Sequence, residues 1–249
     1  MLERFDTALE HKEVQTGNDY QYASITDITE SESNVSCTDS VFTEIIANNI
    51  NILNINAMRS IFTKATMKDA VLCNDFLRWC DFEEVHMTNA LVLGCSLTHS
   101  NLLKANFSRS KIFSSEISNA NLSEAKFIST SISKTLFEEC NLDKANFGSS
   151  NINNCSFYKC KFAGVNIGGV EFNNCIFYDF DFTNAIGLDA AVFNHCIFMM
   201  DNLVIDRQNY RTLSLDTKDI EDKRGCIKVV VDEDQQTEYI TYSTRKRRV

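Results

Sequence analysis

The sequence predicts a repeat fold in which the chain turns every few residues, and three observations support this. Large apolar residues recur at intervals of five, most clearly in the segment from Ser118 to Phe147. An α-helix repeats its faces about every 3.6 residues and a strand every 2, so neither explains a period of five. Proline is absent and glycine occurs only 8 times in 249 residues, so the turns use ordinary residues.

The five-residue register continues without a break from Phe42 to Phe182. Every position in this column is apolar, which chance does not explain when about half of the residues in an average protein are apolar. A second column lies two residues earlier and holds small residues, from Ala90 to Cys175. The residue between the columns is often asparagine, as in the pentads ANLSE and ANFGS. The unit is therefore a small, a polar and a large apolar residue, followed by two variable ones.

This unit resembles the repeat of the pentapeptide-repeat family, A(D/N)Lxx, and the resemblance covers well over half of the chain. It implies an all-β fold, a right-handed quadrilateral β-helix solenoid in which four pentads make one coil. The large and small columns would point inward, and the other three residues of each pentad would face solvent. Residues one coil apart should stack, as in the column Phe42, Phe62 and Phe82, because like side chains pack closely on like.

The pattern divides the chain into three parts. Residues 1–40 form a polar, acidic tail that we expect to be flexible and partly disordered. Within this tail, Leu2, Phe5 and Leu9 have the spacing of a short amphipathic helix. Residues 41–203 form the β-helix.

Beyond Phe182 the five-residue spacing resumes with an offset of one, so the register slips near residues 183–188 and we expect an irregular last coil. Residues 204–249 are predicted to form a C-terminal cap or β-hairpin, because both ends of a solenoid need protection. Its two strands are predicted at Ile227–Val231 and Glu238–Tyr242. The final RKRRV is a basic tail that we interpret as a solvated end.

Charge and hydropathy exclude several classes of protein. The formal net charge is −10, but residues 1–41 hold 9 acidic and 2 basic residues, whereas residues 42–182 hold 14 and 12. The repeats are thus almost neutral, and no basic face for direct nucleic-acid binding is expected. No run of about 18 apolar residues is present, so no transmembrane segment is predicted. The start lacks the apolar centre of a Sec signal peptide, which indicates the bacterial cytoplasm or delivery into a host cell by another route.

Reactive residues show no catalytic arrangement. Six of the ten cysteines fall in the small inward column, where a free cysteine packs as a small hydrophobe. No pair has the CxxC spacing of a zinc site, and the four histidines are scattered. No glycine-rich phosphate loop, HExxH or GxSxG motif occurs. We therefore predict a protein that is not an enzyme, with no catalytic residue, no cofactor and no metal site.

Departures from the repeat indicate candidate sites for a protein partner. Asp75 occupies a small inward position, which is unfavourable for a carboxylate, so we expect a local distortion or an outward turn there. Such a bulge would present Trp79, the only tryptophan, to a partner; the alternative is a tolerated local defect that binds no partner. Tyr158 and Tyr178 are 20 apart and should stack on one outer face, and Met199 would extend the stripe unless the C-terminal segment covers it.

Three functions remain open at this stage. The first is a non-enzymatic protein-interaction scaffold, with its most specific form a bacterial effector in virulence, because family members of this kind resemble the chain in having a polar N-terminus before the coils. The second is a DNA mimic that binds DNA gyrase, like the quinolone-resistance members, although those are strongly negative rods joined as dimers by a C-terminal helix. The third is the repeat domain of a larger effector enzyme, such as a ubiquitin ligase, although few residues follow the coils here. We favour the scaffold; the partner is unidentified, and a homodimer stays open.

Overall fold

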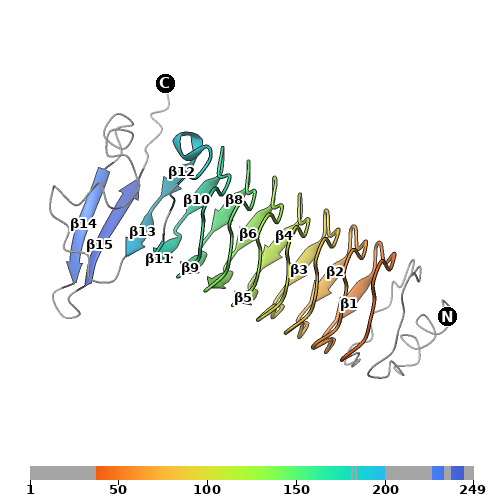
Figure 1. The fold of residues 1–249 in the computed structure, drawn as a ribbon. Coiled ribbons are helices and arrows are strands. Elements are labelled where there is room, and N and C mark those ends of the chain that lie inside the picture. Colours follow the sequence, from red (N-terminus) through yellow and green to blue (C-terminus); the bar gives the residue numbers. More distant parts are fainter. Residues whose placement is uncertain (1–37, 181, 183, 200–225, 233–236, 244–249) are drawn as a thin grey trace.

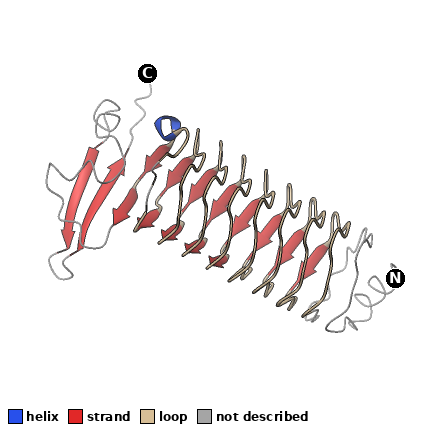
Figure 2. Ribbon diagram, viewed as in Figure 1, coloured by secondary structure: helices blue, strands red, loops and turns tan. Residues whose placement is uncertain are grey.

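The computed structural model describes residues 38–180, 182, 184–199, 226–232 and 237–243 (Figure 1). The chain winds into stacked coils that form a rod, with short strands lying side by side along its length (Figures 1 and 2). The predicted all-β solenoid is therefore confirmed. Among these residues, no helix has both the length and the apolar character needed to cross a membrane.

Two sides of the rod are sheets in which the strands of successive coils pair in parallel. The sheet on the first side, in the order of its strands, contains β1 (Asn51–Leu53), β2 (Val71–Cys73), β3 (Leu91–Leu93), β4 (Lys111–Phe113), β6 (Ser131–Ser133), β8 (Asn151–Asn153), β10 (Glu171–Asn173) and β12 (Val192–Asn194). The sheet on the second side contains β5 (Glu116–Ser118), β7 (Leu136–Glu138), β9 (Ser156–Tyr158), β11 (Ile176–Tyr178), β13 (Cys196–Met199), β15 (Thr237–Ser243) and β14 (Cys226–Asp232). The other two sides are joined by isolated parallel bridges, as between Asn121 and Asn141.

Backbone hydrogen bonds join each coil to both of its neighbours. The Phe127 N–H donates to the Asn146 carbonyl at 2.7 Å, toward the next coil, and the Lys126 N–H donates to the Ala105 carbonyl at 2.8 Å, toward the preceding coil. Each partner lies about four pentads away along the chain, so one turn of the rod contains four pentads. The vertical neighbours predicted from the sequence, such as Leu122 and Leu142, follow from this pairing.

Corners between the sides use residues in the left-handed backbone region. In the part of the chain that the structure describes, many residues other than glycine have positive φ, and from Asp39 to Asn184 they all stand at the fifth position of a pentad. A short turn precedes the next side, as when the Ala125 N–H donates to the Leu122 carbonyl at 3.0 Å. The left-handed conformation is unfavourable for most L-residues. The repeated bonds between coils over-determine it, so the rod turns without proline and with few glycines.

Side chains fill the lumen in stacked columns. Phenylalanine rings one coil apart lie nearly parallel: Phe137 and Phe157 have centroids 4.9 Å apart, and Phe157 and Phe177 have centroids 5.0 Å apart. The small column adds polar links between coils. The Ser110 hydroxyl, for example, accepts the Ala90 N–H at 3.0 Å and donates to the Met87 carbonyl at 2.6 Å. Both predicted inward columns are thus observed.

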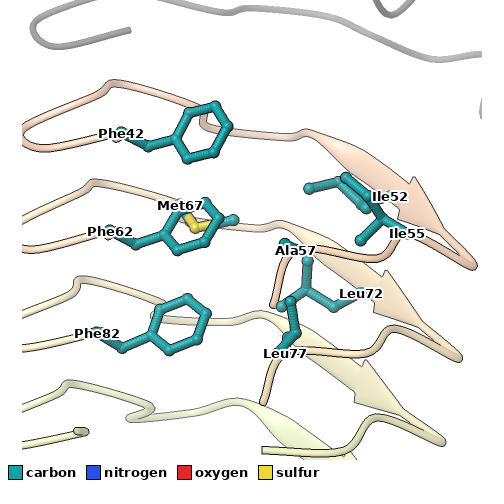
Figure 3. A pocket seen from close by; sticks show the side chains of 9 residues that line it. All are labelled: Phe42, Ile52, Ile55, Ala57, Phe62, Met67, Leu72, Leu77 and Phe82. Carbon is teal, nitrogen blue, oxygen red and sulfur yellow. The ribbon is translucent and has the colours of Figure 1, made fainter. Parts of the chain in front are cut away.

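The lumen of the first two coils contains small residues at positions that hold large ones elsewhere. Ala57 stands at a large inward position whose vertical neighbour is Leu77, and Ala47 stands at another, above Met67. A cavity with a wholly apolar lining lies beside Ala57 (Figure 3). It is lined by Phe42, Ile52, Ile55, Ala57, Phe62, Met67, Leu72, Leu77 and Phe82. The N-terminal coils of the described core therefore enclose an apolar cavity.

The last coil contains the predicted insertion. Phe172 of β10 pairs with Phe193 of β12, which is one position farther along the chain than the regular spacing would place its partner. The extra residue is absorbed by a 3₁₀ helix at Leu188–Ala190, which follows Gly187 at a φ of 73°. β14 and β15 pair antiparallel, and β15 pairs antiparallel with β13. The C-terminal hairpin thus extends the second sheet beyond the last coil. Residues 1–37, which are most of the predicted flexible tail of residues 1–40, lie outside the described residues.

Candidate interaction surfaces

Trp79 lies at a corner of the second coil, on the side that later carries β5. Among the non-glycine residues with positive φ that the structure describes, it is the only one that is not polar, and its φ is 56°. Its side chain is 49% exposed. The indole stacks on the His99 ring of the next coil, with centroids 5.4 Å apart and an interplanar angle of 7°. The same left-handed backbone recurs at the other corners, so this corner differs in its residue type, because a bulky aromatic residue rarely adopts that conformation.

Two other residues of the same pentad lie on its outer side. Phe76 is 54% exposed, and the Arg78 guanidinium Nε donates to the Ser96 hydroxyl at 3.1 Å. Phe76, Arg78 and Trp79 therefore form an aromatic and basic surface on one coil. We call these three residues the Trp79 surface.

Asp75 corrects an expectation from the sequence. Its side chain is 1% exposed and points into the rod, and the coil around it is regular, because Phe76 bridges Asn56 and Ser96 with the usual spacing of one coil. The predictions of a distorted coil and of an outward turn are both wrong. The carboxylate Oδ1 accepts the Ile55 N–H at 2.8 Å, which is the bond that serine hydroxyls accept elsewhere in this column. Trp79 is therefore presented by an ordinary corner.

The protonation of Asp75 explains how the lumen accommodates it. Burial raises the pKa of the Asp75 carboxyl from 3.8 to about 7, although the hydrogen bond from the Ile55 N–H acts in the opposite direction. The thiol of Cys95 lies 3.9 Å from its second oxygen. Near neutral pH a large share of the molecules therefore carry an uncharged acid here, which is far less costly to bury than a carboxylate.

Tyr158 and Tyr178 form the second predicted surface. Their rings stack with centroids 4.5 Å apart at 8°, so the predicted stacking is confirmed. The Lys159 ammonium lies 5.3 Å from the centre of the Tyr158 ring, within the range of a cation–π contact. The backbone of Met199 pairs in register with Tyr178, but its side chain lies outside what the structure describes. We call Tyr158 and Tyr178 the tyrosine pair.

The structure places the two surfaces on one side of the rod without joining them. Trp79 and Lys159 occupy the same corner column, and four coils separate them, which corresponds to roughly 19 Å at the usual spacing of about 4.8 Å. A single large partner, or an extended one, could reach both.

Charges on the neighbouring corner column alternate in sign. Reading along the rod, this column holds Glu44, Lys64, Glu84, Lys104, Glu124 and Lys144. The Lys104 ammonium lies 3.9 Å from a Glu84 carboxylate oxygen. Because each carboxylate has an amine one coil away, this column has no uniform negative potential.

The cysteines serve the packing. In the described part of the chain eight cysteines are free, and all except Cys73 are buried. Burial raises the pKa of the Cys80 and Cys95 thiols to about 12, so they stay protonated and unreactive. Nowhere in the described part do three His, Cys, Asp or Glu residues lie close enough to hold a metal ion.

Sequence reasoning missed one surface, on the outer face of the first sheet. The residues on either side of the inward one in β1 to β4 are mostly apolar, and they stack in two columns. One column contains Leu53, Cys73, Leu93 and Phe113, and the other contains Val71 and Leu91. The sequence does contain a signal for this surface, because apolar residues recur here once per coil at positions that face solvent. We call these six residues the outer apolar strip.

Comparison with known proteins agrees with this architecture. The family described as Pentapeptide repeats matches residues 77–112, 114–143 and 140–179, with 8 copies of its repeat. None of the curated proteins compared with the chain matches it.

Solved structures resemble this chain at low sequence identity. HetL, a pentapeptide repeat protein involved in heterocyst differentiation regulation from the cyanobacterium Nostoc sp. strain PCC 7120, is 15% identical, with a TM-score of 0.39 over 77% of this chain and 96% of HetL. QnrB1, a plasmid-mediated fluoroquinolone resistance protein, is 16% identical, with a TM-score of 0.40 over 80% of this chain and 97% of QnrB1.

Proposed function

Because this chain is a pentapeptide-repeat protein, we propose that it acts as a non-enzymatic scaffold that binds a protein partner through the Trp79 surface. The tyrosine pair would be a second contact on the same side of the rod. The observation that carries the proposal is the position of Trp79: a large, half-exposed aromatic residue occupies a left-handed corner that polar residues occupy elsewhere.

The physical argument concerns what Trp79 does for the fold. Its side chain contributes nothing to the lumen, and a corner in this conformation favours small polar residues such as asparagine. Aromatic residues with a polar neighbour are typical anchors of protein interfaces, since they bury a large area and lose little conformational entropy. The stacking on His99 fixes the indole orientation before any partner arrives, which lowers the entropic cost of binding.

The lumen supports the non-enzymatic part of the proposal. It is lined by stacked side chains, and Asp75 is the one acidic or basic residue buried in the described part of the rod. The cavity of the first coils has only apolar residues in its lining, so it offers no acid, base or nucleophile to a substrate.

The alternating charge column counts against a DNA mimic that binds gyrase. A mimic of the phosphate backbone needs one sign of charge along a face, whereas Glu84 and Lys104 are paired across adjacent coils. Delivery into host cells as an effector is a finer form of the scaffold proposal. It is supported by the acidic, polar composition of residues 1–40.

Affinity capture with matched variants tests the scaffold. The full chain, Trp79→Asn and Glu139→Asn would each be used to capture proteins from bacterial and host-cell lysates. Glu139 belongs to the same corner column as Trp79, has a φ of 51° and is exposed, so its change to asparagine is a matched control. We expect a partner that the full chain and Glu139→Asn retain and that Trp79→Asn loses.

Each other outcome decides against part of the proposal. Partners that Trp79→Asn retains in full would remove the Trp79 surface from the site. Partners lost only with Tyr158→Ser and Tyr178→Ser together would move the site to the tyrosine pair. Recovery of gyrase subunits, together with an effect on gyrase supercoiling, would favour the DNA mimic.

A further inference from the structure

The outer apolar strip is a sheet face whose outward side carries apolar residues that are partly accessible to solvent. In β2 and β3 every residue is apolar, whether it points into the lumen or away from it. The middle residues, Leu72 and Val92, are buried, while the flanking residues are only partly buried. Pairing places Cys73 beside Leu93, and Val71 beside Leu91. The strip is therefore continuous across adjacent strands.

The strip has defined ends and a basic border. Toward the C-terminus it stops at Ser131 and Ser133 of β6, which lie beside Lys111 and Phe113 of β4. Lys111 is exposed, and Arg109 occupies the corner that leads into β4. The fourth coil thus places two positive charges at one edge of the apolar residues.

The dimensions of the strip limit what can cover it. Three steps between strands at about 4.8 Å make it about 14 Å long, and two residues of a strand at about 3.3 Å make it about 7 Å wide. Stable dimers bury about 800 Å² on each partner, so a second copy held by this strip alone would not be stable. A single amphipathic helix or strand is the size of occupant that fits.

We propose that the N-terminal segment of this same chain, residues 1–13, docks on the outer apolar strip as an amphipathic helix. Its apolar residues Leu2, Phe5 and Leu9 have helical spacing, and Leu2 to Leu9 spans about 10 Å along a helix, or about two coils of the rod. One turn of helix, about 5.4 Å, nearly matches the spacing of the strands. Successive apolar side chains can then contact successive strands.

Charge supports the same occupant. On a helix of about 3.6 residues per turn, the four acidic residues of this segment fall along one flank of the apolar stripe. These residues are Glu3, Asp6, Glu10 and Glu13. Arg109 and Lys111 border the strip with the opposite sign. The connection through residues 14–37 can extend to roughly 80 Å, so it imposes no barrier, and the tether raises the local concentration of the segment to about the millimolar range.

Cys73 provides a native probe because it lies in the strip and is the one described cysteine that is not buried. The rate of its alkylation by N-ethylmaleimide would be measured in the full chain by peptide mass spectrometry, which separates it from the other cysteines. The test variant combines Leu2→Ser, Phe5→Ser and Leu9→Ser. If at least about four molecules in five are docked, Cys73 should react at least about fivefold faster in this variant.

The matched control changes the opposite face of the same helix and keeps its charge, with Arg4→Lys, Thr7→Ser and His11→Ser. We expect the rate of the unaltered chain in this control, and a faster reaction in Lys111→Glu at low salt, where the charge attraction is least screened. Equal rates in the unaltered chain and in the Leu2, Phe5 and Leu9 variant would overturn the proposal. A Cys73 rate that falls as protein concentration rises would also overturn it, because a second copy would then be the occupant.

Discussion

The first sheet has two halves with the same parallel strand pairing and different outer faces. From β1 to β4 the outward residues are mostly apolar, whereas from β8 to β12 they are mostly asparagines that bond from coil to coil. The Asn173 amide donates to Asn153 at 3.0 Å, and the Asn194 amide donates to Asn173 at 2.8 Å. Two inward positions in each pentad thus specify the coil, and the outward residues are free to differ.

The interior also differs between the two ends of the rod. At the N-terminal end, Ala57 borders a cavity and Asp75 occupies the small column. Toward the C-terminus, stacked phenylalanines such as Phe157 fill the lumen. The exposed Phe76 and Trp79 lie at the N-terminal end as well. The half that contains the cavity is therefore also the half with the unusual outer surface.

Removing a phenylalanine from the lumen should have the largest effect, and the effect should differ between the halves. The Phe157 ring packs against Phe137, Phe162 and Phe177, so Phe157→Ala should lower the free energy of unfolding by about 3–5 kcal/mol. Phe62 stacks on Phe42 and Phe82 but already borders the cavity. Because it has fewer close neighbours to lose, Phe62→Ala should cost at least about 1 kcal/mol less.

Urea unfolding followed by circular dichroism measures both losses. Equal losses of unfolding free energy for Phe62→Ala and Phe157→Ala would show that the cavity does not loosen the N-terminal coils. The two halves would then not differ in how well their interiors are packed.

Asp75→Ser should produce the next largest effect, and its sign depends on pH. The pKa of the carboxyl is about 7 in the fold against 3.8 in the unfolded chain, so the folded state binds more protons between these values. Stability due to this group is therefore greatest below about pH 4 and is lost as pH rises to about 7. The full loss is at most about 4 kcal/mol, because each pKa unit corresponds to about 1.4 kcal/mol. Serine occupies this column elsewhere and can accept the Ile55 N–H, so Asp75→Ser should be more stable above pH 7.

The measurement is the free energy of unfolding at pH 4.5, 6 and 7.5 for the chain, for Asp75→Ser and for the exposed control Asp69→Asn. The slope with pH should flatten in Asp75→Ser alone. A slope that persists in Asp75→Ser would assign the pH dependence to other groups.

Most of the rod could be predicted from the sequence because its physics is local and repeated. An inward column such as Phe137, Phe157 and Phe177 appears as an unbroken apolar register, and the slip before Phe193 appears as one extra residue. Asp75 could not be placed in this way, because an aspartate is ordinarily charged at neutral pH. Its burial and its bond to Ile55 change which protonation state is present, and only the folded neighbours show this.

The candidate surfaces were predictable in part. The stacking of Tyr158 on Tyr178 follows from their separation by one coil. The stacking of Trp79 on His99 follows from the same rule, but the left-handed backbone at Trp79 had to be observed. The outer apolar strip was not predicted, because the five-residue register describes only the inward positions and the strip lies on the outward ones. A column such as Leu53, Cys73 and Leu93 becomes visible when outward residues 20 apart are compared with one another.

The smallest predicted effect concerns the asparagine half of the first sheet. Asn173→Ala removes an amide that bonds to both Asn153 and Asn194, so the free energy of unfolding should fall by about 1 kcal/mol. The matched change in the apolar half is Leu93→Ala, at the equivalent outward position of β3. In the chain that lacks residues 1–13, Leu93→Ala should change the free energy of unfolding by no more than about 0.5 kcal/mol, as at ordinary surface sites. A loss for Leu93→Ala as large as that for Asn173→Ala, in that shortened chain, would mean that the strip stabilises the coils themselves. The two halves would then differ in how they hold the rod together, and the apolar residues would need no occupant to explain them.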